Sequence, residues 1–334
     1  MASRLKLAPT APTELARIKA AMPAVPLPAP PPPGVKAAPL ALTKRMTVEQ
    51  ACRCILRNCI AQMTANEANL AAAPEALHQM RVGLRRLRSA FSLFAGVLAT
   101  PPEWRDDIDW LSAQLGAARD WDVLAGATLP RIAEQLPEGQ ELVLVRLAAE
   151  VRADALRAAA AEAVASPRYA ALMQNLERWL RDGGWRDAST ARQRRELGQP
   201  VRDYALAALE RAHARLRKRG RRLRHATAQT RHRVRIAAKK TRYAAEFFES
   251  LYRKRRIAPW VTSLSALQDE LGLLNDAAVA DALLKNLQDG EAQADGSAAF
   301  MRGYLAADAA ARRRGGQRTV RKLWKACAQL TLPR

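Results

Sequence analysis

Aromatic and acidic residues are both scarce in this sequence of 334 residues. Only 5% of the residues are aromatic, and 32 Asp and Glu stand against 55 Lys and Arg, which leaves a net charge of +23 and a pI near 11.0. So large a basic excess excludes an ordinary near-neutral enzyme and indicates a polyanionic partner. The many Ala, Leu and Arg residues favour helices over strands. With 49% hydrophobic residues the chain can bury a core, so we expect a folded, all-α protein.

Cysteines and long apolar runs are also few. Cys52, Cys54 and Cys59 stand close together and Cys327 stands far away, a spacing that matches no familiar zinc motif. We therefore expect reduced, structural cysteines, no metal and no cofactor. No run of about 18 apolar residues occurs, and the N-terminus lacks the apolar core of a signal peptide. These absences favour a cytoplasmic protein without membrane contact.

Proline separates an expected tail from an expected folded part. The prolines crowded into 1–46 indicate an extended linker or tail. Thr47-Val-Glu-Gln50 has the form of a capping box, so the folded part should begin there. We divide it into two halves, 47–190 and 191–334. The expected helices are 47–70, 74–99, 102–117, 120–136, 140–164 and 167–181, then, after a connection over 183–198, 199–225, 228–252, 258–272, 275–288 and 297–330.

The two halves repeat the same motifs. His78-Gln-Met-Arg81-Val-Gly-Leu-Arg85-Arg86-Leu-Arg88 and His232-Arg-Val-Arg235-Ile-Ala-Ala-Lys239-Lys240-Thr-Arg242 share one pattern, at an offset of 154. Leu115-Gly116-Ala-Ala-Arg119-Asp120 is echoed by Leu271-Gly272-Leu-Leu-Asn275-Asp276 at an offset of 156, and Leu147-Ala-Ala-Glu150 by Leu305-Ala-Ala-Asp308 at 158. Three echoes in order, at a nearly constant offset, predict an internal duplication.

Each long motif places its basic residues on one face of a helix. At about 100° per residue, His78, Arg81, Arg85 and Arg88 share a face, Arg86 lies at its flank, and apolar residues lie opposite. In the second copy His232, Arg235, Lys239 and Arg242 share the face, with Lys240 at the flank. Between 211 and 242 the chain has 14 Lys and Arg and no acid. The like charges repel one another, and a bound anion would relieve this repulsion.

Two other interpretations stay open at this point. A basic face can be merely solvated, and each histidine can be a structural residue at the start of a helix. A purely solvated face, however, has no reason to keep a histidine in register. Asp120 and Asp276 follow the Leu-Gly elements, where we expect turns, and we interpret them first as helix caps or partners of the basic residues and only weakly as catalytic groups.

The paired motifs resemble the CHAD family, the conserved histidine α-helical domain, over about 47–330. The resemblance implies two pseudo-symmetric four-helix bundles whose basic faces line a central cavity or groove and bind inorganic polyphosphate. Leu87 is matched by Thr241 and Arg119 by Asn275, so the two halves need not contribute equally. The polyphosphate contacts that the resemblance implies are His78, Arg81, Arg85, Arg86, Arg88, His232, Arg235, Lys239, Lys240 and Arg242.

The resemblance also implies a binding module without catalytic residues. Many relatives join this domain to a CYTH triphosphatase domain with a Glu-x-Glu-x-Lys motif, and no Glu-x-Glu occurs in this chain. The chain could still be an accessory domain of an enzyme that processes phosphate polymers, although it has no Walker motif. Nonspecific nucleic-acid binding is the other alternative, without a helix-turn-helix signature or a row of stacking aromatics to support it. We expect a location at polyphosphate granules.

Overall fold

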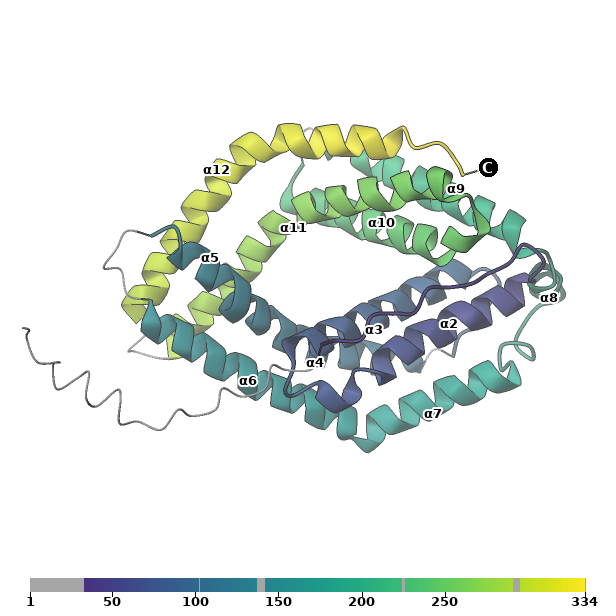
Figure 1. The fold of residues 1–334 in the computed structure, drawn as a ribbon, viewed down its shortest axis with the longest axis horizontal. Coiled ribbons are helices and arrows are strands. Elements are labelled where there is room, and N and C mark those ends of the chain that lie inside the picture. Colours follow the sequence, from purple (N-terminus) through teal and green to yellow (C-terminus); the bar gives the residue numbers. More distant parts are fainter. Residues whose placement is uncertain (1–32, 102, 137–141, 224–225, 291–294, 334) are drawn as a thin grey trace, which may run out of the picture. The chain divides into compact units, whose positions relative to one another are not determined.

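The computed structural model describes residues 33–101, 103–136, 142–223, 226–290 and 295–333. Over these ranges the chain forms helices and their connections, with no strand, which confirms the all-α prediction (Figure 1). The helices are α2 (Val48–Thr64), α3 (Pro74–Phe94), α4 (Trp104–Val123), α5 (Leu129–Ala133), α6 (Val143–Ala165), α7 (Pro167–Asp182), α8 (Ala191–Leu197), α9 (Val201–Gly220), α10 (Ala228–Phe247), α11 (Lys254–Gly290) and α12 (Asp295–Ala328).

Helix starts follow the signals in the sequence. The Thr47 hydroxyl accepts a hydrogen bond from the Gln50 backbone, and the Gln50 side chain accepts one from the Thr47 backbone, which confirms the capping box at the start of α2. Proline occupies the first position of α3 and of α7, where its missing N–H costs nothing. The connection expected over 183–198 contains the short helix α8, which a second capping box starts at Thr190.

Two predicted helix breaks are wrong. The boundary expected between 117 and 120 lies inside α4, and the boundary expected between 272 and 275 lies inside α11. Gly116 and Gly272 do not end these helices, because a single glycine costs a helix only about 1 kcal/mol relative to alanine. Burial of the adjacent Leu115 and Leu271 outweighs that cost. Asp120 and Asp276 are therefore interior helix residues and not caps.

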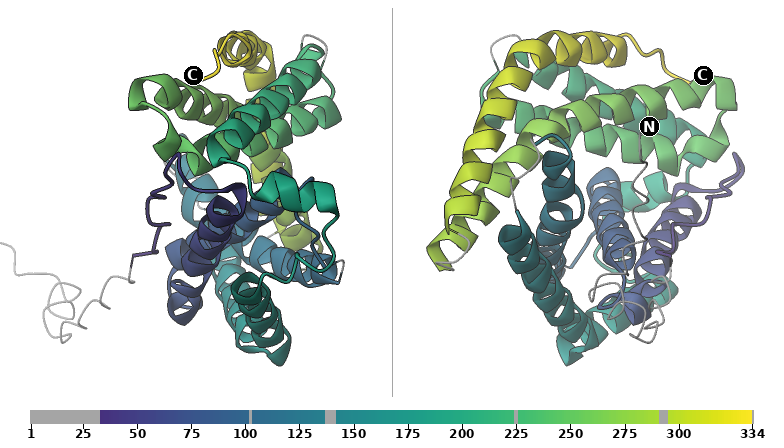
Figure 2. Two further views of the ribbon diagram at one scale, coloured as in Figure 1. Left: turned by 90° about the vertical axis from the view of Figure 1, so that its right-hand side faces the viewer. Right: turned by 60° about the vertical axis from the view of Figure 1, so that its left-hand side comes forward.

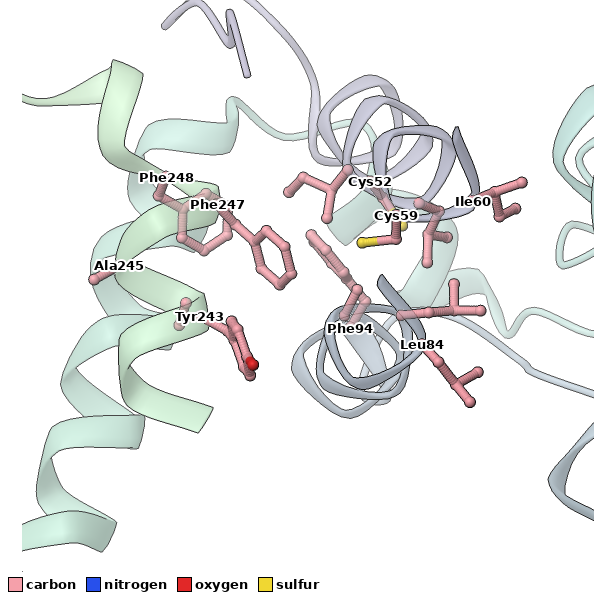
Figure 3. Packing of buried hydrophobic residues seen from close by; sticks show 14 of the residues in the cluster. Cys52, Cys59, Ile60, Leu84, Phe94, Tyr243, Ala245, Phe247 and Phe248 are labelled. Atoms are coloured by element: carbon pink, nitrogen blue, oxygen red, sulfur yellow. The ribbon is translucent and has the colours of Figure 1, made fainter. Parts of the chain in front are cut away.

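One hydrophobic core joins helices from both predicted halves. It includes residues of α2, α3, α7, α9, α10 and the first part of α11. Phe94 of α3 stacks on Tyr204 of α9, with 5.4 Å between ring centroids, and meets Phe248, directly after α10, edge-on at 6.4 Å. Figure 3 shows Phe94 between the α2 side chains and Phe247 of α10. The core thus holds α3 and α10, the two helices with the basic motifs, against each other.

A second hydrophobic cluster joins α4, α5 and α6 to α11 and α12. It packs Trp121, Leu129 and Val145 with Leu284 of α11 and Met301 of α12. The two long helices α11 and α12 lie side by side in all views of the ribbon (Figures 1 and 2). Because its two ends join different clusters, α11 connects the second cluster to the main core.

The segment 33–46 lies against the helices in an extended form. The Asn66 side chain exchanges two hydrogen bonds with the Val35 backbone, at 2.8 and 2.9 Å. The Ser250 hydroxyl does the same with the backbone of Leu42, whose side chain is buried. We call residues 33–46 the N-terminal strap. The rest of the predicted tail, 1–32, lies outside the described residues, and the internal duplication and the division into two halves stay predictions.

Candidate functional site

Six basic side chains gather where α3, α4, α10 and α11 meet. Lys239 of α10 faces Arg81 and Arg85 of α3, and it also lies beside Arg235 of its own helix. His78 lies near Arg119 of α4 and near the same two arginines of α3. All six are partly buried. We call this group the main cationic cluster: His78, Arg81, Arg85, Arg119, Arg235 and Lys239.

Two aspartates lie beside two arginines of the cluster. Arg81 donates from Nη1 to the Gly116 carbonyl at 3.1 Å and to Asp120 Oδ1 at 3.0 Å. Arg235 also lies beside a glycine, Gly272, with its Nη2 3.9 Å from Asp276 Oδ1, which is an ion pair without a hydrogen bond. Asp120 and Asp276 thus lie as partners of the basic residues, which was one of the predicted roles. In the Leu-Gly-x-x-x-Asp spacing, the glycine lets the guanidinium approach the helix backbone. The aspartate, one turn further along the helix, then lies beside the same guanidinium.

Burial and crowding of charge act together on Lys239. Burial, together with Arg235, Arg85 and Arg81, lowers the pKa of Lys239 to about 7, and Asp276 opposes this only in part. The amine is therefore only partly protonated near neutral pH. Burial and the three arginines thus outweigh Asp276, the one acid that acts on Lys239 among the described residues.

His78 experiences the same imbalance. Burial lowers its pKa below the ordinary value, Arg119, Arg85 and Arg81 act in the same direction, and Glu75 opposes them. The imidazole is thus mainly neutral at pH 7. An anion bound beside Arg119 and Arg85 would favour its protonated form and gain a donor.

A second basic group lies around Lys240, the next residue along α10. Burial lowers the pKa of Lys240, and so do Arg215 and Arg219 of α9 and Arg88 of α3. Lys240 donates from Nζ to Ser92 Oγ at 3.0 Å, and Arg88 pairs with Asp109 at 2.8 Å. We call Arg88, Arg215, Arg219 and Lys240 the second cationic cluster. Arg81, Arg85 and Arg88 follow one face of α3 and thereby connect the two clusters.

Arg86 does not join either cluster. It is only 7% exposed and donates to Gln62 Oε1 at 2.8 Å and to Asn58 Oδ1 at 2.7 Å. Its guanidinium also lies over the Phe247 ring, 5.4 Å from the centroid. The Arg86 side chain therefore points toward α2 and α10, and its N–H groups donate to side chains of the protein and not to a ligand.

Arg242 and His232 also lie apart from the six clustered residues. Arg242 pairs with Glu246 one turn away and donates to Gln268 Oε1 at 3.2 Å. His232 is exposed near the start of α10, and no hydrogen bond or ion pair joins it to another described residue. The two histidines of the motif thus differ, because His78 is partly buried among cations and His232 faces solvent.

Sequence reasoning missed three cations of the clusters. Arg119 lies within the Leu-Gly-x-x-Arg-Asp element, which was a usable signal. However, we expected a helix boundary between 117 and 120, so Arg119 was not placed on a helix that packs against α3. Arg215 and Arg219 were visible only as part of a basic run. Their proximity to Lys240 depends on how α9 packs against α10, which helical periodicity does not reveal.

The described residues contain no group of His, Cys, Asp and Glu suited to hold a metal ion.

The four cysteines are free, and burial raises the pKa of Cys59 and Cys327 to about 12, so these thiols are poor nucleophiles at neutral pH. Among the helices that the structure describes, none is long and apolar enough to cross a bilayer.

Comparison with known proteins gives a family match over most of the chain. A model of the CHAD domain matches residues 54–285. The crystal structure of the CHAD domain from the plant Ricinus communis is 38% identical, with a TM-score of 0.80, covering 91% of this chain and 99% of that one. PptA from Streptomyces chartreusis has a similar fold, with a TM-score of 0.60 at 18% identity over 84% of this chain and 99% of PptA. No curated protein sequence matches significantly.

Proposed function

Because the chain belongs to the CHAD domain family, whose known function is related to polyphosphate, we propose that it binds inorganic polyphosphate at the two cationic clusters. The observation that carries this proposal is the half-buried, undercompensated charge of the main cationic cluster, where burial and three arginines lower the pKa of Lys239 to about 7. A polyanion restores the missing negative charge.

The chemistry of the clusters suits linked phosphates. The planar guanidinium groups of Arg81, Arg85 and Arg235 can each donate two parallel hydrogen bonds to phosphate oxygens, whereas Lys239 supplies a compact charge. The face of α3 from Arg81 to Arg88 is about 10 Å long, so one extended chain can contact several of these side chains in sequence. Binding releases counterions and is expected to weaken steeply with salt.

Partial burial of the main cationic cluster favours a thin polymer over a nucleic-acid duplex. A duplex presents its phosphates on a wide, rigid cylinder, whereas polyphosphate is narrow and flexible and can approach side chains that are only partly exposed. Competition at equal phosphate concentration separates the two ligands. Equal displacement by duplex DNA and by polyphosphate at all salt concentrations would favour the nucleic-acid alternative.

We further propose that binding is not accompanied by catalysis. Asp120 pairs with Arg81 and Asp276 lies 3.9 Å from Arg235, so we assign both carboxylates to positioning the cations and not to acid–base chemistry. Incubation of long-chain polyphosphate with the protein, Mg²⁺ and nucleotide is expected to leave the chain length unchanged on a gel. Shortening that disappears in a His78→Ala variant would overturn this part. Under this proposal the protein associates with cytoplasmic polyphosphate granules.

The main test is calorimetric titration with long-chain polyphosphate. Arg81→Ala/Arg235→Ala should lower the affinity at least tenfold, because each lost charge-assisted hydrogen bond is worth about 1.5 kcal/mol or more. The matched control is Arg57→Ala/Arg152→Ala, which removes the same charge from two exposed arginines without an ion pair among the described residues. Unchanged affinity of the first variant, with its helical circular dichroism intact, would place the site elsewhere.

A further inference from the structure

A small basic pocket lies at the start of α11. It is lined by Leu251 and Tyr252 and by five cations, with no acid in its lining, and has a volume of about 260 Å³. We call it the corner pocket. The five cations come from three segments: Lys44 of the N-terminal strap, Arg202 of α9, and the start of α11, where Arg253 precedes the helix and Arg255 and Arg256 lie in its first turn.

The corner pocket is separate from the two cationic clusters and shares no residue with them. Arg202 precedes Arg215 by 13 residues on α9, which is about 20 Å along a helix. Tyr252 lies beyond the C-terminal end of α10, whereas Lys239 lies in its middle. A ligand in the corner pocket therefore does not use the polyphosphate site proposed above.

Within the part of the chain that the structure describes, the side chains of the five cations of the corner pocket are unpaired. Among the described residues, no side-chain hydrogen bond or ion pair is formed by Lys44, Arg202, Arg253, Arg255 or Arg256. All five side chains are exposed. Five like charges around one small concavity repel one another, and a bound anion would remove that repulsion.

Backbone and tyrosine donors add to the cations. α11 begins at Lys254, and within the described chain the first N–H groups of this 37-residue helix, those of Lys254 and Arg255, have no backbone acceptor. The positive end of the helix dipole therefore points to the same side as the arginines. The hydroxyl of Tyr252 is buried without a partner among the described residues. Burial raises the pKa of Tyr252 to about 12, so it keeps its proton near neutral pH, with Arg202 and Asp203 as the charged neighbours.

We propose that the corner pocket binds a compact anion with two or three linked phosphates. The pocket is smaller than the ~300–1,000 Å³ of sites for drug-sized ligands, so it suits a short charged group and not an extended polymer. Several arginine forks around one point match the tetrahedral oxygens of linked phosphates, each of which accepts several hydrogen bonds. Such a group occurs both in free short-chain phosphates and in nucleoside triphosphates.

An anion in the corner pocket would connect three segments. Lys44 lies in the N-terminal strap, which ends where α2 begins, and Arg202 lies in the first turn of α9. A ligand that contacts both of them and the start of α11 would hold these segments together, and it would stabilise the folded state through its binding free energy.

The test uses tripolyphosphate as the probe and hydrogen exchange as the readout. With the whole protein, tripolyphosphate should slow exchange of the amides in 40–46, 200–204 and 251–257. Arg202→Gln/Arg255→Gln should remove this protection and weaken tripolyphosphate binding at least tenfold. Lys44→Met, a change on the exposed strap, should weaken it several-fold. Protection confined to α3 and α10, or unchanged binding by both variants, would overturn the proposal.

Two comparisons keep this test independent of the polyphosphate proposal. Arg81→Ala/Arg235→Ala should retain the protection by tripolyphosphate at 251–257 even if it loses long-chain polyphosphate. ATP in place of tripolyphosphate distinguishes the two sources of the ligand. Equal affinity indicates that only the phosphates are recognised, whereas tighter binding of ATP indicates that the nucleoside contributes, and both outcomes support a phosphate pocket.

Discussion

Arg81 donates a hydrogen bond to Asp120 at 3.0 Å, so an acid of the protein already occupies one of the directions in which this arginine could bind phosphate. The pair is not deeply buried, since its side chains are 25% and 39% exposed. Asp120 therefore positions the guanidinium and competes with an incoming anion at the same time.

Removal of that competitor should strengthen binding. Asp120→Asn keeps the size of the side chain but removes its charge, and we expect polyphosphate affinity to rise by several-fold. The free energy of unfolding should fall by less than about 1 kcal/mol, the usual value of a partly exposed ion pair. Calorimetry and thermal unfolding measure the two effects. Asp182→Asn, which frees Arg181 on α7, is the control and should leave affinity unchanged. A loss of affinity in Asp120→Asn would mean that orientation of Arg81 matters more than competition.

Polyphosphate binding should depend on pH because of Lys239. The charged groups that face Lys239 are Arg235 of its own helix, Arg81 and Arg85 of α3, and Asp276 of α11. The free amine loses its proton above a pKa of about 7, and a bound polyanion would raise this pKa. Affinity should therefore fall as the pH rises above 7, and binding near neutral pH should be accompanied by proton uptake.

Titrations in two buffers of different ionisation enthalpy measure this proton uptake. Lys239→Arg keeps its charge at all of these pH values and should flatten the profile, so an equally steep profile in this variant would assign the effect to another group.

The same pKa predicts a stability effect without ligand. The unfolded state binds the proton between about pH 7 and 10.5 while the folded state does not, so stability rises with pH in that window.

Arg86 should be needed for the fold and not for the ligand. Arg86→Met keeps much of the side-chain volume. It leaves two side-chain oxygens, Gln62 Oε1 and Asn58 Oδ1, without their donor. We expect a loss of about 1–3 kcal/mol in the free energy of unfolding. Polyphosphate affinity of the folded protein should stay within twofold of the wild type. A tenfold loss of affinity with little change in urea unfolding would show that Arg86 contacts the ligand.

Gly220 should tolerate no side chain. A Cβ atom at this position would lie 1.7 Å from Nε1 of Trp324, so the last turn of α9 and the indole of α12 would have to separate. We expect Gly220→Ala to lower the free energy of unfolding by about 1–3 kcal/mol or more, as overpacking of a close contact does. Gly303→Ala, inside α12 with nothing within 4 Å of the new Cβ, is the matched control and should be neutral or stabilising by about 0.5–1 kcal/mol in thermal unfolding. Equal stability of both variants would contradict the close packing.

Helical periodicity predicted the residues of the clusters that share a helix. His78, Arg81 and Arg85 lie together as expected, and so do Arg235 and Lys239. Arg86 shows the limit of this reasoning. At the flank of a helical wheel a side chain can turn to either side, and here the amides of Asn58 and Gln62 on α2 decide its direction. No pattern within α3 contains that information.

The contacts across helices were the other part that the sequence did not predict. Arg119 stays on the same helix as Leu115 because buried neighbours outweigh the glycine, which a local rule for helix ends ignores. Arg215 and Arg219 approach Lys240 only after α9 packs on α10. The all-α class followed from composition, whereas these contacts depend on tertiary packing.

The isolated β-bridge between Thr47 and Pro200 has a consequence for folding. The Val48 N–H donates to the Gln199 carbonyl and the Val201 N–H to the Met46 carbonyl, both at 2.9 Å, so the starts of α2 and α9 are joined directly. Closing a loop of roughly 150 residues costs about 4 kcal/mol of chain entropy, which two hydrogen bonds alone do not repay. The bridge must therefore form together with the shared core around Phe94, Tyr204 and Phe248. The two halves of the polypeptide are for this reason expected to unfold in one cooperative transition, and neither half is a self-sufficient folding unit.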